Sequence, residues 1–250
     1  MHRFYLPPKQ CGEAALRLDG REAHHALHVL RVKRGDAVSV LDGAGREFVC
    51  EITGRSQSSL DLQVTKTISV PPPPCSITLL QAVPKGRIIE DIIQKAVELG
   101  ARRVVPLLTR RVVIRLDDRE AIAKGQKWQQ VAIEAVKQCG ATWLPQIEPP
   151  ATIDNFLQRK ETFDLALVGS LQPDRHHPRE CIQAFQAQHR RQPRSAGVWI
   201  GPEGDFTIEE LKLIQAAGAH PVSLGRLVLR VETAAIYCLS VLNYELNPAE

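Results

Sequence analysis

Four consecutive prolines, at residues 71–74, constrain the fold of this chain more than any other feature. Proline has no backbone N–H to donate and clashes with a preceding helical turn, so the run neither continues a helix nor pairs inside a sheet. It is predicted to be a stiff, extended linker. Because 250 residues leave room for two domains, we expect them at residues 1–70 and 75–250.

The part before the prolines has the period-two pattern of short strands. Apolar residues alternate on both sides of a turn at residues 42–45, which predicts a β-hairpin. A further alternating strand is expected at residues 59–68, and one helix is expected from residue 21 to near Gly35. Several short strands with a single helix predict a small β-barrel.

After the prolines, strand and helix patterns alternate, which predicts an α/β domain with a mostly parallel sheet. The expected strands are residues 76–83, 102–108, 163–169, 197–201 and 220–224. The expected helices are residues 87–100, 127–140, 180–189, 207–217 and 231–246.

The stretch "VWIGPEGDFT", residues 198–207, predicts a turn that binds a ligand. A short apolar run is typical of a buried strand, and Thr207 with Glu210 has the spacing of a capping box that starts a helix. Gly201 and Gly204 permit a positive φ or a close approach of backbone to ligand. Turns at the carboxyl edge of α/β sheets bind ligands, although an ordinary strand–helix turn is the alternative.

The composition of this turn excludes the common phosphate loops. It has neither G-x-x-x-x-G-K-[ST] nor G-x-G-x-x-G, and it carries Glu203 and Asp205 where an anion would sit. The two carboxylates would repel a phosphate. A neutral or cationic ligand is therefore favoured.

A second loop, "SLGRLVLRVETAA", is apolar although it follows a strand end. Leu224, Leu227 and Leu229 surround Gly225, which suits a flat, uncharged ring held between leucines. The alternative is a loop buried against its own helix. Thr233 is predicted to cap that helix.

Together these two stretches resemble the cofactor-binding signature of the RsmE-type 16S ribosomal RNA uridine-N3 methyltransferases. These enzymes belong to the SPOUT superfamily of trefoil-knotted methyltransferases that use S-adenosylmethionine (SAM). "HRFYL", "HHALHVLRVKRGDAVSVLDGAG" and "KGRIIEDIIQKAVELGARRVVPLLTRRVV" also resemble family segments, in the family's order. The resemblance thus covers the whole chain.

The resemblance implies a PUA-like β-barrel that binds RNA, a trefoil-knotted α/β methyltransferase domain and a homodimer. It also implies that SAM, whose sulfonium is a cation, occupies the glycine turn and the leucine loop, with the end of the strand before Ser170 as a third segment. The expected cofactor residues are Val168, Gly169, Ile200, Gly201, Pro202, Glu203, Gly204, Leu224, Gly225, Leu227, Leu229, Arg230 and Thr233.

The chain departs from the family pattern at three places. Asp205 replaces the second glycine after the glutamate, and Val228 to Thr233 read VLRVET where ILRTET is usual. Lys137 and Ala141 stand where many members have glutamate and arginine. The last departure concerns the RNA-facing surface and leaves the target nucleotide open.

Methylation of uracil at N3 requires loss of an imide proton and an in-line approach to the methyl carbon, so positioning and charge stabilisation should dominate catalysis. Arg230 is predicted to stabilise negative charge on the base. Glu232 is predicted to orient Arg230 or to accept the proton through water. The alternative for Arg230 is a salt bridge to Glu232 or Glu203.

Bulk charge does not explain RNA binding. The net charge is +4, with ten basic and eight acidic residues before Pro71 and 22 and 20 from there on, so each part has only +2. Binding must therefore rely on local clusters. The expected RNA-binding residues are Arg3, Arg31, Lys33, Arg34, Lys85, Arg110 and Arg111.

Several classes of protein are not expected. The six cysteines form no C-x-x-C pair, as is typical of reduced thiols in a cytoplasmic protein. Neither a run of 18 apolar residues nor an N-terminal apolar segment occurs, so no membrane helix and no secretory signal are predicted. His24 and His28 have the i, i+4 spacing of metal ligands, but no third ligand accompanies them, and no metal is predicted.

Two other functions stay open at this stage. One is a SPOUT enzyme with another target, a tRNA base or a ribose 2′-hydroxyl. The other is a non-catalytic RNA-binding protein whose second domain only dimerises.

Overall fold

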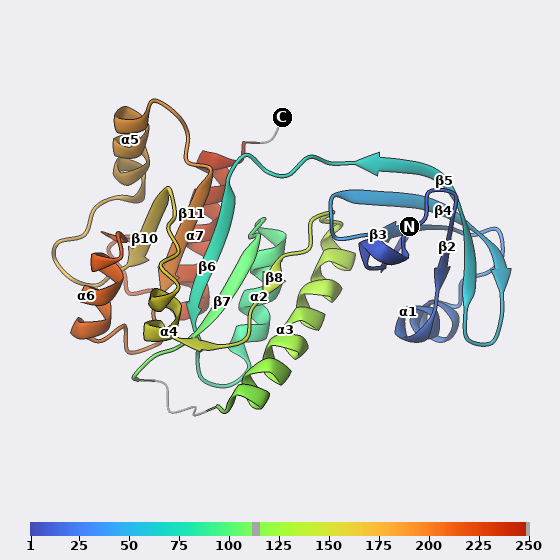
Figure 1. Cartoon of the computed structure of the whole chain (residues 1–250), viewed down its shortest axis with the longest axis horizontal. Helices are drawn as coiled ribbons and strands as arrows, with labels where there is room; N and C mark the ends of the chain where they lie inside the picture. Colours follow the sequence, from blue (N-terminus) through green and yellow to red (C-terminus); the bar gives the residue numbers. More distant parts are fainter. Residues whose placement is uncertain (112–115, 249–250) are drawn as a thin grey trace. The chain divides into compact units, whose positions relative to one another are not determined.

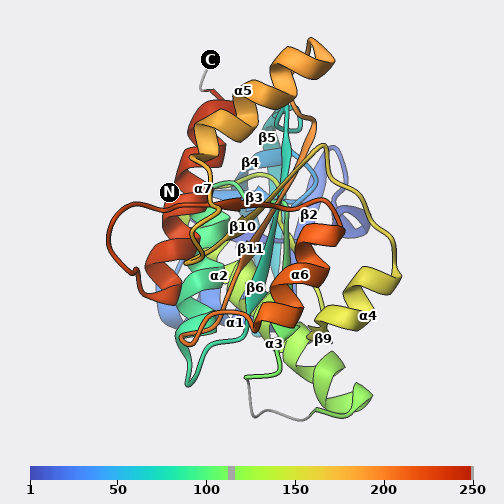
Figure 2. The ribbon, with the colours of Figure 1, turned by 90° about the vertical axis from the view of Figure 1, so that its left-hand side faces the viewer.

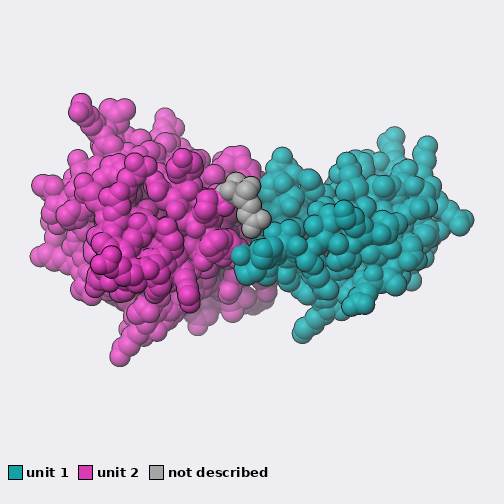
Figure 3. All heavy atoms as spheres, turned by 90° about the horizontal axis from the view of Figure 1, so that it is seen from above, with its two compact units in different colours: residues 1–72, 133–144 teal, residues 73–132, 145–250 magenta. Residues whose placement is uncertain are grey.

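The computed structural model of the chain describes residues 1–111 and 116–248. These residues form two compact units (Figure 3). The first comprises Met1–Pro72 and Ile133–Leu144, and the second comprises the remaining described residues. The boundary between Pro72 and Pro73 falls inside the predicted linker, but residues 133–144 belong to the first unit and not, as predicted, to the second domain.

The first unit is built on a five-stranded sheet with the order β1-β3-β4-β5-β2 (Figure 1). The strands are β1 (His2–Tyr5), β2 (Ala15–Leu18), β3 (Ala37–Leu41), β4 (Arg46–Arg55) and β5 (Leu60–Ser69). Strands β3 and β4 form the predicted antiparallel hairpin. The sequence patterns did not predict β1 and β2.

The hairpin turn is fixed by the buried carboxylate of Asp42. Its Oδ1 accepts from the backbone N–H groups of Ala44 and Arg46 over 2.7 and 2.9 Å. Gly43 and Gly45 adopt φ of 71° and 97°, in the left-handed region that glycine tolerates best. The predicted turn therefore has a local physical cause.

The helix of the first unit is shorter than predicted. It begins as α1 (Gly20–His24), continues as a π-helical segment η2 (His25–Leu30) and ends at Arg31, which has a left-handed φ of 55°. A short 3-10 turn, η1 (Pro8–Gln10), lies between β1 and β2. The left-handed residue closes the helix well before Gly35.

The second unit contains a seven-stranded sheet in which every pair is parallel, as predicted. Its order is β12-β10-β11-β6-β7-β8, with β9 beside β7. The strands are β6 (Ser76–Ala82), β7 (Arg103–Leu108), β8 (Gln146–Ile147), β9 (Ala151–Thr152), β10 (Leu165–Gly169), β11 (Ser195–Ile200) and β12 (His220–Val222). Strands β8 and β9, of two residues each, are too short to show a periodicity.

Helices cover both faces of this sheet (Figure 2). One face carries α2 and α7, and the other carries α4 and α6. The helices of the unit are α2 (Ile88–Glu98), α3 (Asp118–Cys139), whose residues from Ile133 on belong to the first unit, α4 (Ile153–Gln158), α5 (Pro178–His189), α6 (Ile208–Ala216) and α7 (Val231–Leu246). In the part of the chain that the structure describes, no helix is long and apolar enough to span a bilayer.

The two predicted helix caps have opposite outcomes. Thr207 caps α6 in a full capping box with Glu210, as predicted. Thr233 does not cap α7, because that helix already begins at Val231, with Arg230 as its N-cap residue. Val231 is buried, so packing of this apolar residue starts the helix ahead of the polar candidate.

Candidate functional site

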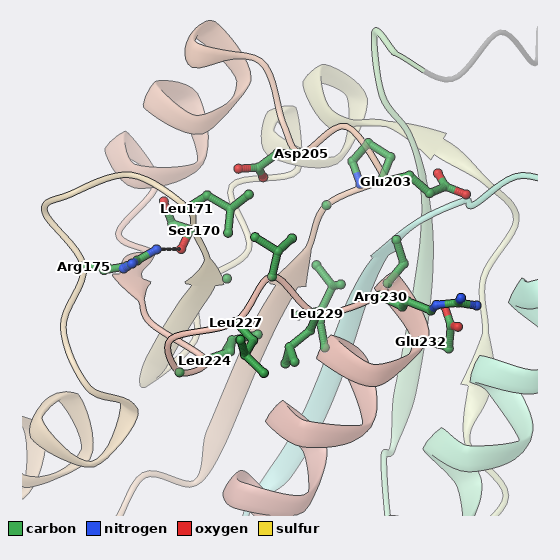
Figure 4. A pocket seen from close by; sticks show the side chains of 18 of the residues that line it. Ser170, Leu171, Arg175, Glu203, Asp205, Leu224, Leu227, Leu229, Arg230 and Glu232 are labelled. Carbon is green, nitrogen blue, oxygen red and sulfur yellow. Dashed lines mark hydrogen bonds between the residues drawn. The ribbon is translucent and has the colours of Figure 1, made fainter.

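A cavity of about 450 Å³ lies at the carboxyl edge of the parallel sheet (Figure 4). Because β10, β11 and β12 are parallel neighbours, the segments that follow them meet there. They are residues 169–171, the acidic turn (residues 201–205) and the leucine loop (residues 223–230), joined by the start of α7. The site is where open α/β sheets bind ligands.

Most of the expected cofactor residues line this cavity. They are Gly169, Ile200, Gly201, Pro202, Glu203, Leu224, Gly225, Leu227, Leu229 and Arg230, and Ser170 and Glu232 also contribute. The sequence reasoning missed Ile88, Leu171, Arg175, Asp205, Val228, Val231 and Ala234 as cofactor residues. Ile88 follows β6, which is far from the other lining segments in the sequence, and Arg175 lies in a polar loop. No local pattern therefore indicated that either residue lines the cavity.

Three expected cofactor residues are absent from the described lining of the cavity. Val168 is fully buried in the sheet core. Gly204 faces the side chain of Arg111, which would lie 3.4 Å from an added Cβ. Thr233 is exposed within the first turn of α7. Each neighbours a lining residue, and backbone direction excludes it.

The acidic turn is tightly packed around Gly201. A Cβ on Gly201 would lie 3.1 Å from Asp205 Oδ1 and 3.2 Å from the backbone nitrogen of Phe206. The left-handed residue of the turn is Asp205, with φ 63°, and neither Gly201 nor Gly204 has a positive φ. Aspartate tolerates this conformation better than most residues, which explains how it replaces the family's second glycine.

The leucine loop presents apolar side chains to solvent beside the cavity. Leu227 and Val228 are 79% and 77% exposed, and Leu171 opposite them is 51% exposed. A loop buried against its own helix would hide these groups, so the structure contradicts that alternative. Exposed apolar groups gathered at one cavity are typical of ligand contact.

The two arginines that line the cavity lie at opposite ends of it (Figure 4). Arg230, Glu232 and Glu203 lie at one end, and Arg175 lies at the other, where its Nη1 donates to the Ser170 carbonyl over 3.4 Å. Within residues 1–111 and 116–248, Arg230 forms no ion pair with Glu203 or Glu232, so the salt-bridge alternative is not observed. Arg230 is exposed and available to a substrate.

The expected RNA-binding residues differ in their surroundings. In the first unit Arg31, Lys33 and Arg34 are exposed, whereas Arg3 is half-buried and donates from Nη1 to the Gln138 carbonyl over 3.3 Å. Arg3 thus packs on the end of α3. In the second unit Lys85, Arg110 and Arg111 are exposed on the loops after β6 and β7.

The rings of His24 and His28 lie with their centroids 4.7 Å apart. The described residues hold no group of three or more His, Cys, Asp or Glu side chains that would bind a metal ion.

Comparisons with known proteins agree with this architecture. The family model of the RNA methyltransferase domain matches residues 71–243, and that of the RNA methyltransferase PUA domain matches residues 18–65. The chain is 31% identical to the ribosomal RNA small subunit methyltransferase E of Bacillus subtilis, over 98% of this chain and 97% of that protein.

Solved structures are similar over the whole length. A methyltransferase from Legionella pneumophila in complex with SAM gives a TM-score of 0.85 at 31% identity, over 97% of both chains. The ribosomal RNA small subunit methyltransferase E of Neisseria gonorrhoeae, bound to SAM, gives a TM-score of 0.85 at 25% identity, over 100% of both chains. The predicted α/β methyltransferase fold with a PUA-like N-terminal domain is confirmed.

The leucine loop, the acidic turn and the parallel sheet that joins them all lie inside the matched methyltransferase domain. With this match and the full-length similarity to its relatives, the chain belongs to the RNA methyltransferase family that includes the ribosomal RNA small subunit methyltransferase E proteins.

Proposed function

We propose that this protein is a SAM-dependent methyltransferase that methylates N3 of a uridine in the 16S ribosomal RNA of the small subunit. The cavity at the carboxyl edge of the sheet carries this proposal, because the two segments that resemble the family signature form its walls. The SAM-bound relatives support the choice of cofactor. The enzyme would act in the cytoplasm, during ribosome biogenesis.

The residues of the cavity fit SAM. The side chains of Leu224, Leu227 and Leu229 offer apolar surface for a flat ring, and Gly201, which has no side chain, contributes backbone to the cavity wall. The carboxylates of Glu203 and Asp205 suit a cationic ligand. SAM, when bound, supplies an electrophilic methyl group.

The uracil base would bind and lose its N3 proton at the end of the cavity where Arg230 lies. Loss of the N3 proton leaves negative charge on the uracil ring, and the exposed guanidinium of Arg230 stabilises it. Glu232, which lines the same end, orients this guanidinium or accepts the proton through water.

Nucleoside analysis of ribosomal RNA tests the proposed function. In a strain that lacks this protein, mass spectrometry of 16S rRNA nucleosides is expected to show the loss of one 3-methyluridine, restored by the wild-type gene. An unchanged 3-methyluridine content would refute the proposal. Loss of a tRNA methylation or of a ribose 2′-O methylation would support the alternative SPOUT target. If calorimetry detected no SAM binding, the remaining alternative would be a non-catalytic RNA-binding protein.

The second unit is proposed to contain the trefoil knot and to form a homodimer through α7. Beyond the side that packs in the unit, α7 has the large side chains of Tyr237 and Tyr244 exposed by 39% and 78%. A helix with this much apolar surface on its outer side favours a partner. Analytical ultracentrifugation at micromolar concentration is expected to give a dimer; a monomer would refute it.

Single exposed cations of the two units are expected to set the salt dependence of RNA binding. Arg31→Ala or Arg110→Ala should weaken binding to small-subunit rRNA and reduce the salt slope by about one, with SAM affinity unchanged. Binding titrations over a series of salt concentrations measure this. Lys66→Ala removes an exposed cation outside the predicted clusters. An equal loss in that control would mean that bulk charge, rather than local contacts, holds the RNA.

A further inference from the structure

Two basic loops of the second unit are tied to the segment that carries the acidic turn. The first loop, residues 83–87, follows β6, and the second, residues 109–111, follows β7. The backbone N–H of Lys85 donates to Glu203 Oε1 over 3.0 Å. The backbone N–H of Arg110 donates to Glu210 Oε1 over 2.7 Å. Carboxylates on or just behind the cavity wall therefore hold both loops.

Glu210 is the more constrained of these two carboxylates. It is only 3% exposed, and its second oxygen, Oε2, accepts from the backbone N–H of Thr207 over 2.9 Å. A buried carboxylate requires hydrogen-bond partners, and here each oxygen has a backbone N–H from a different segment. One side chain thus fixes both the start of α6, directly behind the acidic turn, and the loop that carries Arg110.

These bonds leave the basic side chains to solvent. Lys85, Arg87, Arg110 and Arg111 are all exposed. Among the described residues, the first three form no ion pair, and Arg111 donates from Nη1 only to the carbonyl of Asp205, over 3.4 Å. Unpaired cations gathered in this way attract phosphate. We call these four residues the basic surface.

The basic surface adjoins the cavity at two points. Arg87 immediately precedes Ile88, which lines the cavity. Arg111 contacts Asp205, another lining residue. An RNA strand whose phosphates lie on this surface therefore has a base within reach of the cavity only while the loops keep their place.

We propose that Glu210 and Glu203 are positioning residues: they hold the loops that carry the basic surface at a fixed position beside the cavity. The proposal rests on the function proposed above and deepens it. The same carboxylates then connect the RNA-binding loops to the segment that carries the acidic turn. They act through the loops that they hold and need no contact with RNA.

Glu210→Gln, compared with Glu209→Gln, separates positioning from charge. Glu209 is the exposed neighbour; hydrogen bonds at the helix start lower its pKa, with a smaller contribution from Arg110. Both substitutions remove one negative charge beside the basic surface, so electrostatics alone strengthens RNA binding in both. If Glu210 acts by positioning, Glu210→Gln should instead weaken RNA binding, because an amide cannot accept a hydrogen bond at both ends.

For Glu210→Gln, the KM for small-subunit rRNA is expected to rise about fivefold to tenfold and the salt slope to fall by about one, the effect of one displaced phosphate contact. SAM affinity, measured by calorimetry, should stay within about twofold, because the cavity walls are intact. In Glu209→Gln, RNA binding should be unchanged or tighter. Glu203→Ala, at an exposed position, removes the acceptor of the Lys85 N–H; it should also raise the KM for RNA and provides a second variant should Glu210→Gln not fold.

RNA binding by Glu210→Gln and Glu203→Ala as tight as that of Glu209→Gln would overturn this proposal. The proposed function would be untouched by that result, because it depends on methylation by the wild-type protein. Conversely, a wild-type protein that leaves rRNA unmethylated would refute the function without bearing on how the loops are held.

Discussion

Gly201→Val is expected to abolish SAM binding while the protein stays folded. The Cβ would lie 3.1 Å from Asp205 Oδ1 and 3.2 Å from the nitrogen of Phe206, so the turn that lines the cavity must shift to admit a branched side chain. Overpacking of this kind costs the folded protein about 1–3 kcal/mol, whereas displacement of a turn that forms the cavity wall is expected to lower SAM affinity about 100-fold or more. Calorimetry with SAM, beside thermal unfolding of the same sample, measures both effects.

Gly204→Val is the matched control for this substitution. Gly204 belongs to the same turn but is not among the residues that line the cavity, and its nearest neighbour is the flexible side chain of Arg111 at 3.4 Å. It should bind SAM with nearly normal affinity. Normal affinity in folded Gly201→Val would remove the acidic turn from the cofactor site.

Arg230→Ala is expected to slow methyl transfer about 100-fold, the usual effect of deleting one group that stabilises developing charge. RNA binding should weaken much less, because a single phosphate-type contact contributes only a small part of the affinity. Single-turnover kinetics with saturating SAM and RNA separate the chemical step from binding. Arg230→Lys, which keeps the charge, should recover part of the rate.

Arg226→Ala provides the control for loss of a cation from the same loop. Arg226 is exposed and does not line the cavity, so its removal should leave the single-turnover rate unchanged. If Arg230→Ala methylates at the normal rate under these conditions, its assignment to charge stabilisation is wrong.

Local sequence signals were sufficient to predict structures whose hydrogen bonds join residues only a few positions apart. The capping box of Thr207 and Glu210 forms as predicted, and so does the hairpin around Asp42. In both cases a side chain satisfies backbone N–H groups two to four residues away, so distant contacts are not required. The same reasoning failed at Thr233: the N-cap residue of α7 is Arg230, three residues earlier, and the helix begins at the buried Val231.

The sequence therefore determined the central hairpin of the first unit, the alternation of the main strands and helices of the second unit, its parallel sheet and the two segments that form most of the cavity. Only the tertiary structure decided that Ile88 and Arg175 also line it, that Val168 and Gly204 do not, and that Glu210 holds the loop of Arg110. Periodicity, caps and turns report on neighbours along the chain. A cavity wall instead depends on which strand ends become neighbours in the sheet. The neighbours are selected by packing between residues that are far apart in the sequence.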